Sequence, residues 1–265
     1  MKKILALVLA AVMLFALVAC GAQTQTTETT ENTELTYAVE AGSAGEEIAN
    51  EKGFKVNSVD TQAKALMEVE AGTSDAAIID LLMAGAMIGE GTSYPDLKTT
   101  EELTEEKYVA GCRKGSDLAA FINNVLSEAY ADGSLVETAT KYGVQAALVE
   151  QPAPTQSEPA ADGDVAYIQG KGTLVVGITD FAPMDYKNDA GEWIGFDADM
   201  AKVVAEKLGV DIEFVEIDWD NKIFELDGKQ IDVVWNGMTL TEEVGNAMEC
   251  TNAYCNNAQV IVVKG

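Results

Sequence analysis

Side chains suited to holding a small polar molecule follow several of the strands that the sequence predicts. Asp80 stands at the carboxyl end of the buried run 75–79, DAAII. Ligands of open α/β sheets bind off the carboxyl ends of strands, so this carboxylate is a candidate partner for an amine. Asp80 also precedes the apolar segment LLMAGAM, where it would serve as a helix N-cap. The local pattern leaves both roles open.

Aromatic and small polar residues follow three further predicted strands. Phe181 comes after the run 174–178, Trp219 after 212–216, and Asn236, Gly237 and Thr239 after 231–235. Such residues at the ends of neighbouring strands predict a polar pocket with aromatic walls. For each aromatic taken alone, packing in the core is the competing interpretation.

A helix start offers a complementary site in the first half of the chain. The run 35–39 predicts a strand, and Ser43-Ala44-Gly45-Glu46 is a capping-box pattern that opens a helix ending near Gly53. A strand, a tight turn and a helix N-terminus form a corner that suits an anion.

The elements that must position these residues alternate along the chain. Helices are predicted at 61–70, 116–132, 134–143 and 197–208, the third opened by an S-x-x-E box at Ser134. Short strands alternating with helices indicate an α/β fold rather than a helical bundle or a β-sandwich. Segments 22–34 and 150–163 are polar or proline-rich and are predicted to be linkers.

Composition excludes several kinds of protein. The chain has no histidine, which excludes a histidine base, a Ser-His-Asp triad and a histidine-containing zinc site. No CxxC pair supports a metal site, and we expect no metal, no cofactor and no catalytic residue. The net charge of −27 argues against nucleic acid as a partner. Cys112, Cys250 and Cys255 are expected to be buried free thiols, with a bridge between Cys250 and Cys255 as the alternative.

The first twenty residues indicate export. Lys2 and Lys3 precede the apolar run 4–19, which is too short for a typical membrane-spanning helix and suits a signal peptide. The junction LVACG resembles a bacterial lipobox, so we expect cleavage before Cys20 and lipidation of its thiol. An uncleaved anchor helix is the alternative. Both place the folded domain outside the cytoplasm, at a membrane.

Two parts of the chain resemble amino-acid-type (type II, family 3) extracellular solute-binding proteins of ABC importers. Segment 172–264 resembles their first lobe through GTLVVGITDFAPMDY, GEWIGFDADMAKVVAEKLGV, IDVVWNGMTLT and NAQVIVVK. Segment 35–143 resembles their second lobe and terminal helices through AVEAGSAGE, ALMEVEAGTSDAAIID, RKGSDL and ADGSLVETATKYG. The halves stand in reversed order, which implies a circular permutation; two unrelated half genes or a truncated tandem is the alternative.

The resemblance implies a two-lobed periplasmic-binding-protein type II fold, each lobe a mixed sheet flanked by helices. The expected divisions are a signal peptide (1–19), a lipid-anchor linker (20–34), the second lobe (35–107), a crossover with helices packing on the first lobe (108–149), a flexible linker (150–163) and the first lobe (164–265). This division leaves one covalent crossover near 108–113, with Leu35 and Gly265 side by side at the hinge.

Roles of individual residues also follow from the resemblance. Phe181 and Trp219 match the aromatic walls of the site. Asn236, Gly237 and Thr239, and the helix start at Ser43 and Ala44, match groups that meet the ligand's α-carboxylate. Asp80 matches the acid that pairs with the α-ammonium, and Asp180 is a looser match for a side-chain contact. The arginine that clamps the carboxylate in the family is replaced here by Val244.

The sequence therefore predicts a monomeric lipoprotein that captures a small polar solute, an amino acid by expectation, for an ABC importer permease. Two alternatives from other classes are a surface lipoprotein that binds nothing and an exported enzyme similar to cyclohexadienyl dehydratases, which share the fold.

Overall fold

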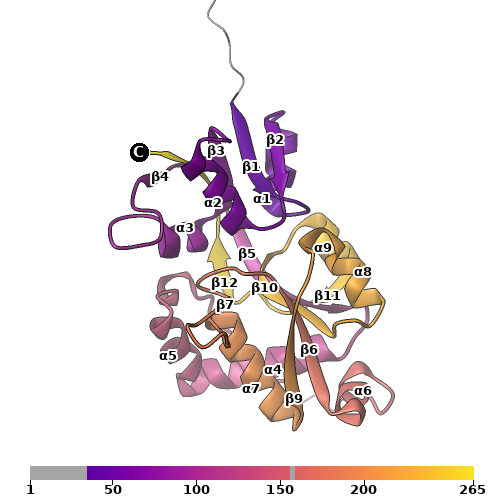
Figure 1. Ribbon diagram of the computed structural model, residues 1–265. Helices are drawn as coiled ribbons and strands as arrows, with labels where there is room; N and C mark the ends of the chain where they lie inside the picture. Colours follow the sequence, from indigo (N-terminus) through magenta and orange to yellow (C-terminus); the bar gives the residue numbers. More distant parts are fainter. Residues whose placement is uncertain (1–34, 156–158) are drawn as a thin grey trace, which may run out of the picture. The chain divides into compact units, whose positions relative to one another are not determined.

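The computed structural model describes residues 35–155 and 159–265, and two mixed sheets organise them (Figure 1). The predictions made for residues 1–34, including the signal peptide and Cys20, lie outside the described residues. Among those described, no helix combines the length and apolar character needed to span a bilayer.

The first sheet has the order β2-β1-β3-β13-β4. Its strands are β1 (Thr36–Glu40), β2 (Lys55–Val59), β3 (Ala76–Asp80), β4 (Leu97–Glu102) and β13 (Gln259–Lys264). Strands β1, β2 and β3 are parallel, and β13 runs antiparallel between β3 and β4. With helices α1 (Ala44–Glu51), α2 (Gln62–Ala71) and α3 (Leu81–Met87), this sheet forms what we call the β1 lobe.

Strand β3 is buried on both faces because helices cover each side of it. Ala77 and Ile79 pack with Leu66 of α2, whereas Ala76 and Ile78 pack with Ala49 of α1. Alternate side chains of a strand point to opposite faces, so a run without polar residues suits this central position.

The second sheet has the order β11-β5-β10-β6-β9, with β12 also paired to β5. Its strands are β5 (Glu106–Arg113), β6 (Thr173–Ile178), β9 (Asp211–Glu216), β10 (Val233–Thr239), β11 (Met248–Cys250) and β12 (Cys255–Asn257), and β7 (Tyr186–Lys187) and β8 (Trp193–Ile194) form a separate hairpin. We call this sheet, with the helices on it, the β10 lobe.

Helices cover both faces of the second sheet. Its helices are α4 (Leu118–Asp132), α5 (Ser134–Lys141), α6 (Asp164–Lys171), α7 (Phe196–Leu208), α8 (Lys222–Asp227) and α9 (Glu242–Ala247). Val176 and Trp235 join the core on the α4 and α7 side, while Val234 packs with Trp219 and Leu226 on the opposite side. The two-lobed α/β fold expected from the sequence is thereby confirmed.

Most of the predicted elements are present, but β2, β4, β5, α8 and α9 were not predicted, and other elements differ in detail. The strand predicted at 231–235 continues through Asn236 to Thr239. Ser134 begins α5 as its first residue and does not cap it; its hydroxyl contacts the carbonyl of Ala129. Helix α6 follows the linker directly, a segment for which no element was predicted. The described part of 150–163 contains no helix or strand.

Each half of the chain contributes one strand to the sheet of the other half. Strand β13 was expected in the lobe spanning 164–265, but it lies in the β1 lobe between β3 and β4. An apolar strand pattern does not specify which sheet the strand joins, and this one follows the segment that leaves the β10 lobe. The lobes are therefore connected at 103–105 and again at Ala258, so the expectation of a single crossover was wrong.

The two connections lie against each other. The amide of Leu103 donates to the carbonyl of Gln259 at 2.7 Å, and the amide of Gln259 donates to the Thr104 hydroxyl at 2.8 Å. Paired segments of this kind form a narrow hinge between two lobes.

The described chain does not end at the hinge as expected. Tyr37 near the start of β1 and Val263 near the end of β13 are both register partners of Ala76. Strand β1 therefore begins, and β13 ends, at the side of the β1 lobe remote from the hinge (Figure 1). Because β3 lies between β1 and β13, the spacing of strands in a sheet places Tyr37 and Val263 about 10 Å apart.

Arg113 belongs to the scaffold of the β10 lobe. Its guanidinium lies 3.3 Å from Asp232 and 3.0 Å from Asp164, and it donates to the carbonyl of Ile231 at 2.8 Å. Asp232 is fully buried and also pairs with Lys171 at 2.6 Å. This network ties β5 to the start of β10 and to α6.

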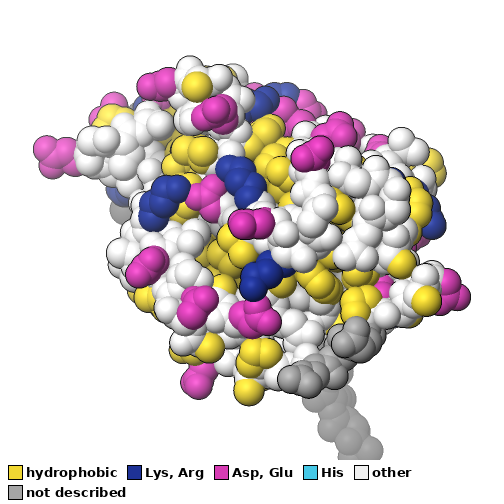
Figure 2. All heavy atoms as spheres, turned by 90° about the horizontal axis from the view of Figure 1, so that it is seen from below, with side chains coloured by type: hydrophobic (Ala, Val, Ile, Leu, Met, Phe, Trp, Pro, Cys, Tyr) yellow, Lys and Arg dark blue, Asp and Glu magenta, His cyan; other side chains and the backbone are white. Residues whose placement is uncertain are grey.

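Charges of both signs are distributed over the face of the molecule that Figure 2 shows, interspersed with apolar and uncharged side chains. The cysteines at 112, 250 and 255 are free, as expected, although Cys250 is only half-buried.

Candidate ligand-binding site

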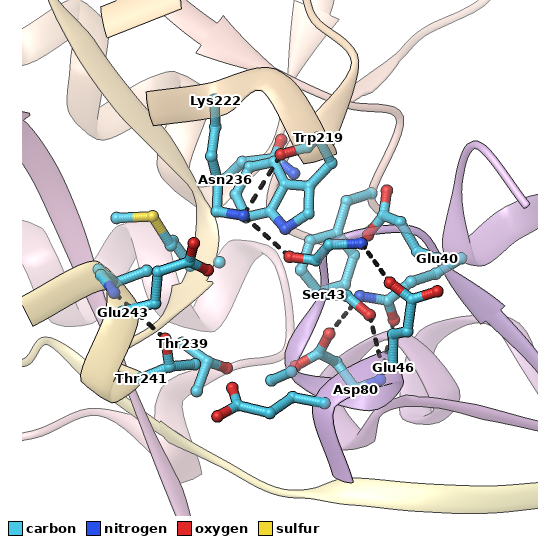
Figure 3. Close-up of a pocket in the computed structure, with 18 of the residues that line it drawn as sticks. Glu40, Ser43, Glu46, Asp80, Trp219, Lys222, Asn236, Thr239, Thr241 and Glu243 are labelled. Carbon is cyan, nitrogen blue, oxygen red and sulfur yellow. Dashed lines mark hydrogen bonds between the residues drawn. The ribbon is translucent and has the colours of Figure 1, made fainter. Parts of the chain in front are cut away.

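A cavity of about 230 Å³ lies between the two lobes (Figure 3). The β1 lobe lines it with the ends of β1 and β3 and with α1, and the β10 lobe lines it with the end of β10 and residues near α8 and α9. Eight of the nine predicted ligand-binding residues line this cavity: Ser43, Ala44, Asp80, Phe181, Trp219, Asn236, Gly237 and Thr239.

Asp180 is the exception. Its carboxylate is exposed beyond β6 and lies in the electrostatic environment of Glu216 and Lys187, away from the cavity lining. Thr179 takes the buried position at the end of this strand, where its backbone amide donates to Asn236 Oδ1 at 2.8 Å. Because side chains of consecutive residues in an extended chain point to opposite sides, Asp180 points outward.

Asp80 is held at the carboxyl end of β3 by a set of donors. Its Oδ1 accepts from Tyr108 at 2.8 Å and from Gln259 at 3.1 Å, and it also accepts from Gln62 and Asn257. Although it occupies the N-cap position of α3, its side chain caps no helix amide. Burial, and then the charge of Glu106, raise its pKa to about 7.

The helix start at Ser43 forms as predicted. Ser43 Oγ accepts from the amide of Glu46 at 3.1 Å, which caps α1. Glu46 does not complete a reciprocal capping box: its carboxylate accepts from the amide of Gly42 at 2.8 Å and from the Ser58 hydroxyl. The first amides of a helix have no intrahelical partner, so those after Ser43 provide donors toward the cavity.

The two aromatic residues form a buried wall of the β10 lobe. Phe181 and Trp219 are 3% and 7% exposed. A Cβ on Gly237 would lie 2.4 Å from a ring carbon of Phe181, and Gly237 has φ +55°. Only glycine fits this position without displacing the ring.

Asn236 and Thr239 are already engaged with protein groups. Asn236 exchanges two hydrogen bonds of 2.8 Å with Thr179, which connects the ends of β6 and β10. The Thr239 hydroxyl donates to Glu106 at 2.9 Å. Asn236 therefore ties β10 to the end of β6, and Thr239 connects β10 to the hinge strand β5.

Sequence reasoning missed five charged residues of the cavity lining, and two of them, Glu40 and Lys222, are buried. Glu40 ends β1 as Asp80 ends β3, so the same strand-end argument would have found it. Lys222 follows Trp219 by three residues, but nothing in the local sequence distinguishes it from a surface lysine. Its Nζ donates to the carbonyls of Gly42 at 2.8 Å and Trp219 at 3.3 Å, and burial lowers its pKa.

Val244 lines the same cavity from α9 and is 2% exposed. The position where the resemblance led us to look for an arginine is thus part of an apolar wall, and Lys222 is the basic side chain among the residues that line the cavity. A lysine supplies a point charge in place of the bidentate fork of an arginine.

A polar cavity between two α/β lobes that are joined by a paired hinge suits the binding of a small solute. Residues 174–265 match the family model for bacterial extracellular solute-binding proteins, family 3. This segment runs from β6 through β13. It therefore includes the aromatic wall and residues 236–239 at the end of β10.

Relatives match over stretches of similar length. The arginine-binding extracellular protein ArtP of Bacillus subtilis is 35% identical over 96 residues, 36% of this chain and 37% of that protein. The L-cystine-binding protein TcyJ of Escherichia coli K12 is 32% identical over 108 residues, 40% of this chain and 41% of that protein. The chain thus spans about two fifths of the length of these relatives, which are both named as binding proteins.

Among solved structures, the arginine-bound form of truncated ArgBP from T. maritima is 40% identical over 31% of this chain and 39% of that chain, with a TM-score of 0.30.

Proposed function

We propose that this protein is an extracytoplasmic solute-binding protein that captures an amino acid for an ABC importer permease. The observation that carries the proposal is the polar cavity between the two lobes. Eight of the residues predicted for ligand binding line it, some from each lobe. The family match over 174–265 and the names of the relatives support it. The protein acts by binding and releasing its ligand, without catalysis.

The chemistry of an amino acid suits the two sides of the cavity. Asp80 is the acceptor for the α-ammonium, and the Ser43 helix start together with Lys222 provides donors for the α-carboxylate. The walls of Phe181 and Trp219 exclude water from the bound ligand. Closure of the lobes about the paired hinge at 103–105 and 258 encloses it.

The proposal includes a lipid anchor at Cys20 and a monomeric receptor. The support is the basic start, the short apolar run and the LVACG junction. Mass spectrometry of the membrane-extracted protein tests this directly: the mature N-terminus should be a diacylated Cys20, and a mature protein that retains Met1 would exclude the anchor.

A binding panel and one pair of variants test the site. Thermal shift across the amino acids and simple amines identifies the ligand, and calorimetry measures its affinity. Asp80→Ala should abolish binding, since a buried ammonium without its carboxylate costs about 3–5 kcal/mol. Asp75→Ala, before the same strand, removes an exposed carboxylate that accepts from the amide of Thr36 and should change the affinity little. Equal affinities for the wild type and the Asp80 variant would remove Asp80 from the site.

A further inference from the structure

Glu40 carries a buried carboxylate that the fold satisfies only in part. It is 3% exposed, lines the cavity, and its Oε1 has no hydrogen-bond partner in the part of the chain that the structure describes. A buried acceptor without a donor is costly. Its position in the cavity wall suggests that the donor comes from a ligand.

A second carboxylate stands beside it. Strands β1 and β3 are parallel neighbours, so Glu40 and Asp80 end at the same edge of the sheet. Both face the cavity (Figure 3). Asp80 has four side-chain donors, whereas Glu40 retains a free oxygen. Two carboxylates at one edge attract a positively charged group more strongly than either would alone.

The rest of the cavity does not balance these charges. Glu46, Glu47 and Glu243 also line it, and Lys222 is the one basic side chain among the lining residues. Lys222 already donates to two backbone carbonyls. A neutral zwitterion would leave this excess of negative charge uncompensated.

A hollow that adjoins the cavity is acidic as well. A second hollow of about 430 Å³ shares Ala44, Glu47, Thr239 and Thr241 with the site. Its other charged lining residues are Glu51, Glu105, Glu106, Lys107 and Glu242. A path lined mainly by one sign of charge concentrates ligands of the opposite sign.

We infer that Glu40 binds the ligand directly, that it forms a two-carboxylate subsite with Asp80, and that the ligand carries a net positive charge. The chemical class is a small aliphatic amine with two cationic nitrogens, either a basic amino acid or a diamine. The inference rests on the proposed function and specifies the substrate class of the same site.

Calorimetry with matched probes tests the ligand class. L-lysine and 1,4-diaminobutane are compared with L-norleucine, which lacks the second amine, and with L-glutamine. At least one of the two cationic probes should bind at least about tenfold more tightly than norleucine. Tight binding of lysine would indicate an amino-acid receptor, and tight binding of diaminobutane alone would indicate an amine receptor. Both outcomes support the charged subsite.

A conservative variant tests the residue. Glu40→Gln should reduce the preference for the tighter cationic probe over norleucine by about tenfold or more and leave the weak binding of norleucine unchanged. Glu70→Gln, an exposed carboxylate of the same lobe, should leave the preference intact. An unaltered preference in the Glu40 variant would overturn its assignment.

Proton release provides a second measurement on the wild type. Burial, and then the charge of Asp80, raise the pKa of Glu40 to about 8. A hydrogen bond with Gln62 and the charge of Lys222 lower this pKa, and Asp218 raises it further. A bound cation lowers the pKa values of both carboxylates, so binding at pH 7 should release protons and tighten toward pH 8. Calorimetry in two buffers of different ionisation enthalpy counts the protons, and zero release would contradict the subsite.

The outcomes separate the two proposals. If glutamine or norleucine binds as tightly as both cationic probes, the charge inference is wrong and the solute-binding function stands. If no amino acid or amine in the panel binds, the proposed function fails with it.

Discussion

The side chain of Lys222 in the β10 lobe donates a hydrogen bond of 2.8 Å to the backbone carbonyl of Gly42 in the β1 lobe. The two residues are 180 positions apart in the chain, and their contact crosses the cavity. Gly42 also lies against Asp220: a Cβ on Gly42 would be 2.8 Å from the Asp220 Cα. These contacts define a closed arrangement of the lobes.

Gly42→Ala should therefore prevent full closure. The added methyl group meets backbone across the cavity, so we expect ligand affinity to fall at least about tenfold, a loss of about 1.4 kcal/mol. Gly53→Ala is a matched control, because Gly53 also has a left-handed φ, +70° against +68°, but nothing lies within 4 Å of its Cβ position. Calorimetry of both variants separates closure from backbone strain, which they share. Equal losses in the two would argue against the contact.

Arg113→Met should destabilise the β10 lobe. The substitution leaves Asp232, which is fully buried, with Lys171 as its remaining cation, and breaking a buried pair typically costs about 3–5 kcal/mol. Lys187→Met removes an exposed pair with Glu216 and should cost less than about 1 kcal/mol. Urea unfolding measures both. A small effect at Arg113 would mean that Lys171 alone compensates Asp232.

Asp185→Asn should stabilise the protein at neutral pH. Asp185 is fully buried, neither of its carboxylate oxygens has a hydrogen-bond partner among the described residues, and the nearby Asp197 carries a second buried carboxylate. Burial, and then Asp197, raise the pKa of Asp185 well above its usual value. Burial also raises the pKa of Asp197 to about 7.

The pH dependence follows from the sign of these shifts. Groups with a raised pKa in the folded state hold protons that the unfolded state has lost, so stability falls as the pH rises from about 4 toward 7. The variant should show a smaller fall and a free energy of unfolding about 1–3 kcal/mol higher at pH 7. Asp189→Asn, an exposed position in the same lobe, is the control. Parallel pH profiles for wild type and Asp185→Asn would refute the argument.

Restoring the order of the family tests the proposed circular permutation. Tyr37 and Val263 share Ala76 as register partner, so Gly265 can be joined to Leu35 by a linker of six glycine and serine residues, which spans about 13 Å. The relinked chain is then opened between residues 155 and 159. We expect the relinked protein to bind the same ligand and to melt within a few degrees of the original. Loss of folding would indicate that the present order of the halves is required.

The sequence predicted the strands and helices around the site better than it predicted their assembly. The strand-end rule located Asp80, and the capping pattern located Ser43, because both depend on neighbours within a few residues. Lys222 was missed because its burial results from the approach of the two lobes. Glu40 was missed although the strand-end rule applies to it as it does to Asp80. The sheet that β13 joins likewise depends on a pairing with β3, some 180 residues earlier, which a local apolar pattern does not encode.

The exchange of β5 and β13 between the halves makes the two lobes thermodynamically inseparable. Strand β13 joins β3 to β4 in the first sheet, and removing it would separate them. Strand β5 joins β10 to β11 in the second sheet in the same way. Neither half of the chain therefore contains a complete sheet. The molecule should melt in one transition rather than lobe by lobe, and its halves, produced as separate polypeptides cut within 150–163, should remain unstructured alone and fold when they are mixed. The hinge that permits motion between the lobes is formed by the same two segments that prevent them from unfolding independently.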